Sequence, residues 1–220
     1  MRATLAVIAL IVSTSAHAQS DVSIESRPCC ELQRAVAARS PEAEVIAAIP
    51  NRAFRQGSDL WLKLDGNRSL RIIDCVAFAC GASFSTHALV AWWPKHRYYV
   101  IDVVVEKGRE AYLISERDGR RTSVFAPPVL SPSGRYAVAA DLGPEYDGLR
   151  IVDMSVDPPS AVEVASRPTC PGSKTLSLRP SPVWLDDSRV GFEGKPFFGD
   201  DDPNARQVLR IVDGKPEWEC

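Results

Sequence analysis

The chain has 220 residues, of which 26 are lysine or arginine and 28 are aspartate or glutamate, so its formal net charge is −2. A charge this balanced gives no electrostatic footprint for nucleic acid or for an acidic membrane surface, and we expect neither as a partner. The 17 prolines and 13 glycines favour a turn-rich fold over long helices.

Residues 1–18 predict a secretory signal that is removed from the mature protein. Arg2 is followed by an apolar run over residues 5–12 and then by Ala16-His17-Ala18, after which we expect cleavage. The apolar run is shorter than the roughly 20 residues that a membrane-spanning helix needs, so no membrane span is expected. Cleavage leaves 202 residues (220 − 18), enough for one domain with a sizeable core. We therefore expect a periplasmic or secreted protein.

The mature chain keeps all of the cysteines, namely Cys29, Cys30, Cys75, Cys80, Cys170 and Cys220. An even number of cysteines in an exported chain predicts disulfide bonds. Six cysteines allow 15 pairings, and the sequence alone does not choose among them. A thiolate metal site is the alternative, but the spacings lack the CxxC pairs that zinc usually takes.

Residues 19–57 differ from the rest of the chain and predict a short helical segment. Leu32 and Val36 fall at helical spacing, and Ser40-Pro41 suits the start of a second short helix. So few residues do not form an independent domain. We expect this segment to pack on a β-domain that covers residues 58–220.

From about residue 58 the apolar pattern changes from helical spacing to alternation. The stretch DLWLKLDGNRSLRIID, residues 59–74, reads as two short strands around an Asp65-Gly66 turn. Residues 96–126 read as three strands joined by turns at Lys107-Gly108 and Asp118-Gly119. Three strands joined by tight turns form an antiparallel meander.

One phrase then occurs twice. PVLSPSGRYAVAAD at 128–141 is echoed by PVWLDDSRVGFE at 182–193, and each copy is followed by LRIVD, at 149–153 and 209–213. The gap from the arginine of the phrase to LRIVD is 14 residues in the first copy (149 − 135) and 20 in the second (209 − 189). Variable length between two fixed elements is typical of loop insertions in a repeated unit. Repeats of this size that consist of short strands are typical of propeller blades.

SPSGRYAVAAD…LRIVD resembles the WD40-like β-propeller repeat of the Tol-Pal accessory protein and of the propeller domains of prolyl peptidases. In that family, Ser-Pro-Asp-Gly-Lys/Arg makes the turn into one strand of each blade. This chain has Ser133 at the usual Asp, and the second copy keeps Asp187 and Arg189 but has Ser188 in place of Gly. The resemblance implies bladed β-sheets, and it carries no functional residue across.

The predicted fold is therefore all-β, with antiparallel blade-like repeats and a short N-terminal helical segment. The mature length allows at most about four units, the lower limit for a closed propeller ring. A small or partial propeller fits this length, and so does a two-sheet β-sandwich closed by the N-terminal helices.

The segment AWWPKHRYY, residues 91–99, contains a candidate binding platform. Trp92 and Trp93, with the neighbouring tyrosines and basic residues, suit the stacking of sugar rings or a peptide. The alternative is that both tryptophans begin a strand and pack between sheets. Alternation along a strand places adjacent side chains on opposite faces, so the two rings do not face the same way.

Two loops occupy equivalent places in the repeated units, LGPEYDG at 142–148 and FFGDDDPNAR at 197–206. We expect both to project from one end of the sheets, which makes Tyr146, Phe197 and Phe198 candidate binding residues. The oxygen ligands of Asp200, Asp201, Asp202 and Asn204 suit calcium. The spacing lacks the pattern of an EF-hand loop, and a solvated hairpin tip explains it equally well.

No catalytic motif stands out. After cleavage the histidines are His87 and His96, and the sequence has no G-x-S-x-G, H-E-x-x-H, phosphate loop or G-x-G-x-x-G. We therefore expect no cofactor and predict a non-catalytic binding or scaffold protein whose partner is a periplasmic protein or peptide. The alternatives are a hydrolase with an unrecognised site and an inhibitor of secreted hydrolases that presents a rigid loop at 196–206. A histidine, a carboxylate and a nucleophile converging in a cleft would favour the enzyme.

Overall fold

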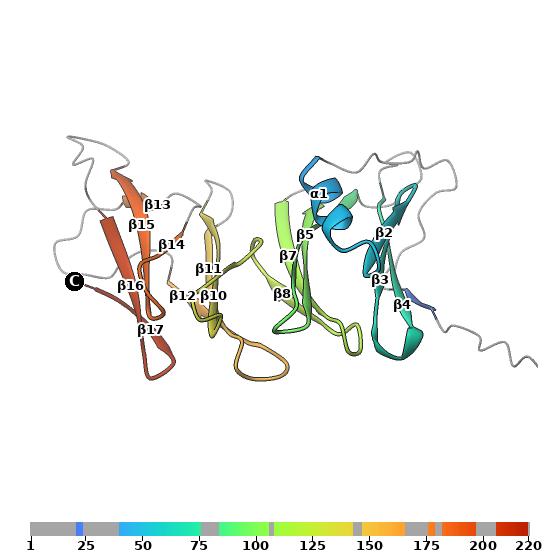
Figure 1. The fold of residues 1–220 in the computed structure, drawn as a ribbon. Helices are drawn as coiled ribbons and strands as arrows, with labels where there is room; N and C mark the ends of the chain where they lie inside the picture. Colours follow the sequence, from blue (N-terminus) through green and yellow to red (C-terminus); the bar gives the residue numbers. More distant parts are fainter. Residues whose placement is uncertain are drawn as a thin grey trace, which may run out of the picture.

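A computed structural model describes residues 21–23, 40–75, 84–105, 108–142, 147–165, 176–178, 182–196 and 206–219 (Figure 1). Four small β-sheets follow one another along the chain and lie side by side in a row. The predicted all-β fold with blade-like sheets is confirmed. No helix in the described ranges is long and apolar enough to cross a membrane.

Sheets 1 to 4 are numbered in chain order. Sheet 1 consists of β1 (Asp21–Ser23), β2 (Ala53–Gln56), β3 (Asp59–Lys63) and β4 (Ser69–Ile73), with a 3-10 turn η1 (Asp65–Asn67) between the last two. Sheet 2 consists of β5 (Ser85–Trp93), β6 (Tyr98–Val105), β7 (Gly108–Ser115) and β8 (Arg121–Val124). Sheet 3 consists of β9 (Val129–Leu130), β10 (Tyr136–Leu142), β11 (Asp147–Asp153) and β12 (Ser160–Val164). Sheet 4 consists of β13 (Leu176–Leu178), β14 (Val183–Trp184), β15 (Arg189–Pro196), β16 (Arg206–Val212) and β17 (Lys215–Trp218). The described pairings are antiparallel except that of β1 with β4.

The repeated phrase forms counterpart sheets, as its sequence predicts. In each copy Pro-Val leads into a short edge strand, β9 or β14, and a polar turn then leads into the longer β10 or β15. The LRIVD stretches form most of β11 and β16, which pair with those longer strands. The meander predicted for residues 96–126 is confirmed as β6, β7 and β8.

The two copies differ in the turn that follows the edge strand. In sheet 3 the Ser131 N–H donates to the Tyr136 carbonyl at 2.8 Å, and Gly134 takes a positive φ of 78°. In sheet 4 the Leu185 N–H donates to the Arg189 carbonyl at 2.8 Å, so the turn closes one residue earlier. The glycine makes the wider turn possible, because its φ is in the region that residues with a Cβ rarely adopt.

The two copies also differ in strand register. Tyr136 lies opposite Asp153 in sheet 3, whereas the corresponding Val190 in sheet 4 lies opposite Leu209, the first residue of its LRIVD. The second hairpin is therefore displaced by four residues relative to the first. Because four is even, the displacement leaves each side chain on its original face, and the apolar stripe survives.

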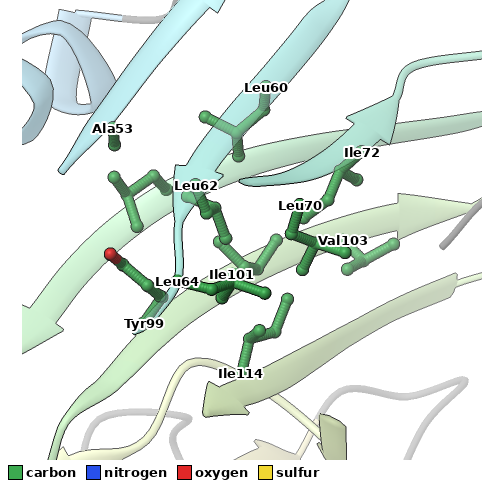
Figure 2. Close-up of a cluster of buried hydrophobic side chains, with 11 residues drawn as sticks. Ala53, Leu60, Leu62, Leu64, Leu70, Ile72, Tyr99, Ile101, Val103 and Ile114 are labelled. Carbon is green, nitrogen blue, oxygen red and sulfur yellow. The ribbon is translucent and has the colours of Figure 1, made fainter. Parts of the chain in front are cut away.

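Apolar clusters fill the three junctions between neighbouring sheets. Between sheets 1 and 2 the buried residues are Ala53, Leu60, Leu62, Leu64, Leu70, Ile72, Leu89, Tyr99, Ile101, Val103 and Ile114. Between sheets 2 and 3 they are Tyr98, Val100, Ala111, Leu113, Val124, Ala137, Ala139, Val152 and Met154. Between sheets 3 and 4 they are Tyr136, Val138, Ala140, Leu149, Ile151, Val190, Phe192, Leu209 and Ile211. Figure 2 shows the first cluster, with side chains of sheets 1 and 2 pointing toward one another.

Strand β6 illustrates how one strand serves two junctions. Tyr98 and Val100 contribute to the cluster with sheet 3, whereas Tyr99, Ile101 and Val103 contribute to the cluster with sheet 1. This arrangement explains why the strand is apolar at every position except Asp102, because both of its faces are covered. Each fully buried aliphatic or aromatic side chain stabilises the stack by about 1.5–3 kcal/mol.

The stack is open rather than ring-closed. Figure 1 shows sheets 1 and 4 at opposite ends of the row. Within the described residues no apolar cluster joins these two sheets. The described sheets are therefore compatible with the partial form of the predicted propeller and with the sandwich that the sequence left as the alternative.

The N-terminal segment contributes strands as well as a helix. Helix α1 (Ser40–Ala48) begins at the Ser-Pro pair, as predicted, and Val45 and Ile46 pack against the first apolar cluster. Strands β1 and β2 also lie within residues 19–57, where the sequence predicted helix alone. The turn at Gly57, with φ 63°, lets β2 pair with β3, whereas β1 pairs in parallel with β4. Leu32 and Val36 lie outside the described residues.

Candidate functional site

A groove with a volume of about 520 Å³ opens where the connection from β8 to β9 passes between sheets 2 and 3. Its lining residues are Arg109, Ala126, Pro127, Val129, Ala140, Asp141 and Pro182. Arg109 lies on sheet 2, and Val129, Ala140 and Asp141 lie on sheet 3. The other lining residues come from the connection between β8 and β9 and from the position directly before β14. We call this feature the inter-sheet groove.

The groove has a fixed cation at one end. Arg109 donates from Nε and Nη2 to the two carboxylate oxygens of Asp102, at 2.7 and 2.9 Å. The Asp102 side chain is 8 % exposed and that of Arg109 is 51 % exposed, so a buried carboxylate holds an accessible guanidinium. The hydrogen bonds to Asp102, with the charges of Asp102 and Asp141, raise the pKa of Arg109 above its ordinary value. The guanidinium is therefore permanently charged and held in one orientation.

The rest of the groove is mainly apolar. Val129 on β9 is 45 % exposed, and Val183 on β14, next to the lining residue Pro182, is 51 % exposed. These valines occupy the same position in the two copies of the repeated phrase. The two edge strands are joined by a hydrogen bond of 2.9 Å from Trp184 Nε1 to the Val129 carbonyl. An apolar surface combined with the Arg109 guanidinium and the Asp141 side chain suits a short extended chain with aliphatic side chains.

A buried charged network lies where α1 meets sheets 1 and 2. Arg55 donates from Nε and Nη2 to the two oxygens of Glu42, both at 2.8 Å, and from Nη1 to Asp74 at 2.8 Å. The Arg55, Glu42 and Asp74 side chains are 8 %, 2 % and 1 % exposed. Burial lowers the pKa of Arg55, but its contacts with Glu42 and Asp74 outweigh this and raise that pKa above its ordinary value. The Arg55 guanidinium is thus held as a cation in the interior, between two buried carboxyl groups.

This network also caps the free edge of β5. Glu42 accepts the Leu89 N–H at 3.0 Å, Asp74 accepts the His87 N–H at 2.6 Å, and Arg55 donates to the His87 carbonyl at 2.5 Å. The strand register shifts between Leu89 and Ala91, as in a β-bulge. Charged side chains therefore satisfy backbone groups that an additional strand would otherwise bind.

His87 forms a carboxylate–histidine pair with Asp74. Its Nδ1 lies 3.1 Å from Asp74 Oδ1. Among the residues that the structure describes, the ring hydrogen bond of His87 is the one to Asp74, and no serine or threonine side chain bonds to the ring. His96 lies elsewhere, edge-on to Trp93 with ring centroids 6.5 Å apart, and burial with the charge of Lys95 lowers its pKa below the ordinary value.

The two candidate tryptophans lie on opposite faces of β5. Trp92 packs against the cluster between sheets 1 and 2 and donates from Nε1 to Glu116 at 3.2 Å. Trp93 packs against the cluster between sheets 2 and 3. Both are partly buried, so their placement follows the packing alternative, and they do not form one platform.

Several predicted residues lie outside the described residues. These are the loop residues Tyr146, Phe197, Phe198, Asp200, Asp201, Asp202 and Asn204, and the cysteines Cys29, Cys30, Cys80, Cys170 and Cys220. Cys75 is described and is 2 % exposed, and its N–H and carbonyl both bond to Ser85, at 2.7 and 2.8 Å. Within the described part of the chain, no group of three or more potential metal-binding side chains occurs.

Comparisons with protein-family models, curated proteins and solved structures found no significant match. The candidate site therefore depends on geometry alone. Sequence reasoning missed the inter-sheet groove, although Val129 and Pro182, two of its lining residues, stand in the repeated phrase. It also missed Arg55, whose partners Glu42 and Asp74 lie 13 and 19 residues away and leave no local motif.

Proposed function

We propose that this protein is an exported, non-catalytic binding module that holds an extended segment of another exported protein in the inter-sheet groove. The observation that carries the proposal is an accessible guanidinium fixed by a buried carboxylate beside two exposed valines on joined edge strands. The groove volume falls in the range of about 300–1,000 Å³ that is typical of ligand sites. Three packed junctions hold the lining strands, and a rigid surface loses little conformational entropy on binding.

The test compares two matched exposed valines. The mature chain, residues 19–220, is immobilised and exposed to periplasmic extract, and bound proteins are identified by mass spectrometry. Val129→Asp changes the groove, whereas Val156→Asp changes a valine of similar exposure, 46 %, in the turn between β11 and β12. We expect a partner that is captured by the native chain and by Val156→Asp but is lost with Val129→Asp. Capture that survives Val129→Asp, or no capture at all, would reject the groove as the binding site.

Export and disulfide bonds form part of the same proposal, and the buried Cys75 beside the β5 strand supports it. Loss of a native disulfide from a small secreted domain typically costs about 2–5 kcal/mol. We therefore expect dithiothreitol to lower the melting temperature of the mature protein by many degrees, measured by circular dichroism. An unchanged melting curve would contradict the disulfides without affecting the groove.

A hydrolase is the second candidate, because the hydrogen bond between His87 and Asp74 resembles the base and its orienting carboxylate in a catalytic triad. Asp74 also binds Arg55, which suits a structural role for the carboxylate equally well. His87→Gln separates the two functions. It would abolish hydrolysis of a panel of nitrophenyl esters if the pair is catalytic, and it would leave capture by the groove unchanged.

A further inference from the structure

The edge strands of the stack differ in how their free backbone groups are protected. On β5, the side chains of Glu42, Asp74 and Arg55 bind the free N–H and carbonyl groups. On β9, Trp184 binds the carbonyl of Val129 at 2.9 Å. Natural proteins protect edges in such ways because an unprotected edge pairs with another chain.

Two further edges carry protection of other kinds. On β8, Arg150 from sheet 3 donates to the Ser123 carbonyl at 3.0 Å, and Arg121 places a charge at the strand start. On β17, Lys215 and Pro216 begin the strand, and proline has no N–H to offer.

Among the described residues, no side chain hydrogen-bonds a backbone group within strand β12, and Trp218 Nε1 donates at 2.9 Å to the carbonyl of Ala165, the residue that follows the strand. Its residues Ser160, Ala161, Val162 and Glu163 are all exposed, and Val162 is 43 % exposed. The strand pairs with β11 on one side and lies at the edge of sheet 3 on the other. Its single charge, Glu163, faces Arg150 on β11, with Nη2 and Oε2 3.9 Å apart. A five-residue edge with a β-branched centre and one partly neutralised charge is a template for another strand.

We propose that β12 pairs with β12 of a second copy of this chain, antiparallel and centred on Val162. A two-fold interface requires a self-complementary strand, and this one meets the requirement. Pairing centred on Val162 places the two Val162 side chains opposite each other. It places Ala161 opposite Glu163 of the other copy, so the like charges of the two Glu163 residues are not opposite. Two four-stranded sheets would thereby join into one continuous sheet.

The proposed register can be tested with two substitutions of Ala161 that should change the dimer affinity in opposite directions. Ala161→Lys places a cation opposite the other copy's Glu163, and Ala161→Glu places a second anion there. Directly opposed charges contribute about 0.2–1 kcal/mol per pair, and the two-fold axis doubles the effect. In sedimentation equilibrium of the mature chain, we expect Ala161→Lys to tighten the dimer about 2- to 30-fold and Ala161→Glu to weaken it by a similar factor.

Val156→Lys is the matched control, since it adds a cation at an exposed position of the same sheet that is not on the edge strand. It should leave the dissociation constant unchanged. Because Ala161 is exposed, its variants should keep the native melting temperature, which circular dichroism checks.

Three outcomes would overturn the proposal. They are a single monomeric species up to millimolar concentration, a dimer that is indifferent to both Ala161 variants, and a change of the same sign in both. A monomer whose capture of another exported protein is lost with Ala161→Glu would assign the edge to that protein's strand instead. None of these results depends on the inter-sheet groove, so the proposed function stands or falls separately.

Discussion

The junction between sheets 1 and 2 contains a buried ionic network, whereas the junction between sheets 3 and 4 is apolar and closed by tryptophan side chains. In the first, Arg55 binds Glu42 and Asp74 and so connects α1, sheet 1 and β5. In the last, Trp184 Nε1 donates to Val129 and Trp218 Nε1 donates to Ala165, both at 2.9 Å. The apolar packing between the sheets is of the same kind in both junctions.

The difference lies at the edges of the sheets and not at their faces. Alternating apolar residues suffice to stack one sheet on the next, whichever part of the chain supplies them. Free strand edges must be covered separately, and this molecule covers β5 with ions and β9 with an indole. The following variants test whether the two kinds of contact differ in energy as their chemistry predicts.

The largest effect is expected for Arg55→Met at the first junction. The substitution leaves the buried carboxylates of Glu42 and Asp74 without their cation, and breaking a buried ion pair typically costs about 3–5 kcal/mol. The control is Arg71→Met, which breaks an ion pair with Asp59 whose arginine side chain is 41 % exposed and should cost about 0–1 kcal/mol. Urea unfolding of the two variants gives the comparison. Equal costs would mean that the network does not hold the first junction.

The next largest effect is expected for Leu209→Ala at the last junction. Leu209 is fully buried between sheets 3 and 4, and removal of a buried leucine side chain costs about 2–5 kcal/mol. Leu185→Ala, at a position that is 37 % exposed, should change the free energy of unfolding by about 0.5 kcal/mol or less. The two variants are compared by their urea midpoints, provided that the denaturant slope m stays the same. A small loss of stability for Leu209→Ala would show that the last two sheets do not unfold with the rest.

Smaller effects are expected for the indole hydrogen bonds. Trp184→Phe and Trp218→Phe each remove one N–H donor, at a cost of about 0.5–1.5 kcal/mol apiece. Trp61→Phe is the contrasting variant, because Trp61 Nε1 is buried without a hydrogen-bond partner among the described residues. Its removal should leave stability unchanged or raise it, since an unpaired buried donor is itself unfavourable. Thermal melts of the three variants would refute this account if Trp61→Phe were the most destabilised.

The sequence predicted the last two sheets better than the first, for a physical reason. The repeated phrase carries its pattern within a few residues, and that local pattern decides turns and strands. The sequence pattern could not reveal that the second hairpin is displaced by four residues. An even displacement keeps Val190 and Leu209 on the same face, so the alternation of apolar residues is unchanged. The Arg55 network could not be foreseen, since its contacts join residues 13 to 47 positions apart. Val129 and Val183 were visible in the repeat, but their exposure depends on which strands lie beyond them.

The smallest effect is expected for the turn of the repeated phrase, which contains a carboxylate in sheet 4 but not in sheet 3. In sheet 4, the Asp186 carboxylate accepts the N–H and hydroxyl of Ser188, at 2.8 and 2.9 Å, and also binds Arg189. The hydrogen bond from the Ser188 backbone, followed by those from Arg189 and the Ser188 hydroxyl, lowers the pKa of Asp186 from 3.8 to about 2. The equivalent position in sheet 3 is Pro132, which has no carboxylate.

A carboxylate whose pKa is lower in the folded than in the unfolded state binds fewer protons when folded, so acid opposes folding there. The contribution of Asp186 is therefore complete above about pH 4 and is lost as the pH falls toward 2. In an NMR titration we expect the Ser188 amide to shift with a midpoint near pH 2 and the Gly134 amide of sheet 3 to show no such transition. Asp186→Asn keeps an acceptor for Ser188 but removes the charge, so it should abolish the Ser188 transition while preserving the turn. A midpoint near the ordinary carboxyl value would mean that the shorter turn of sheet 4 is closed by its backbone alone.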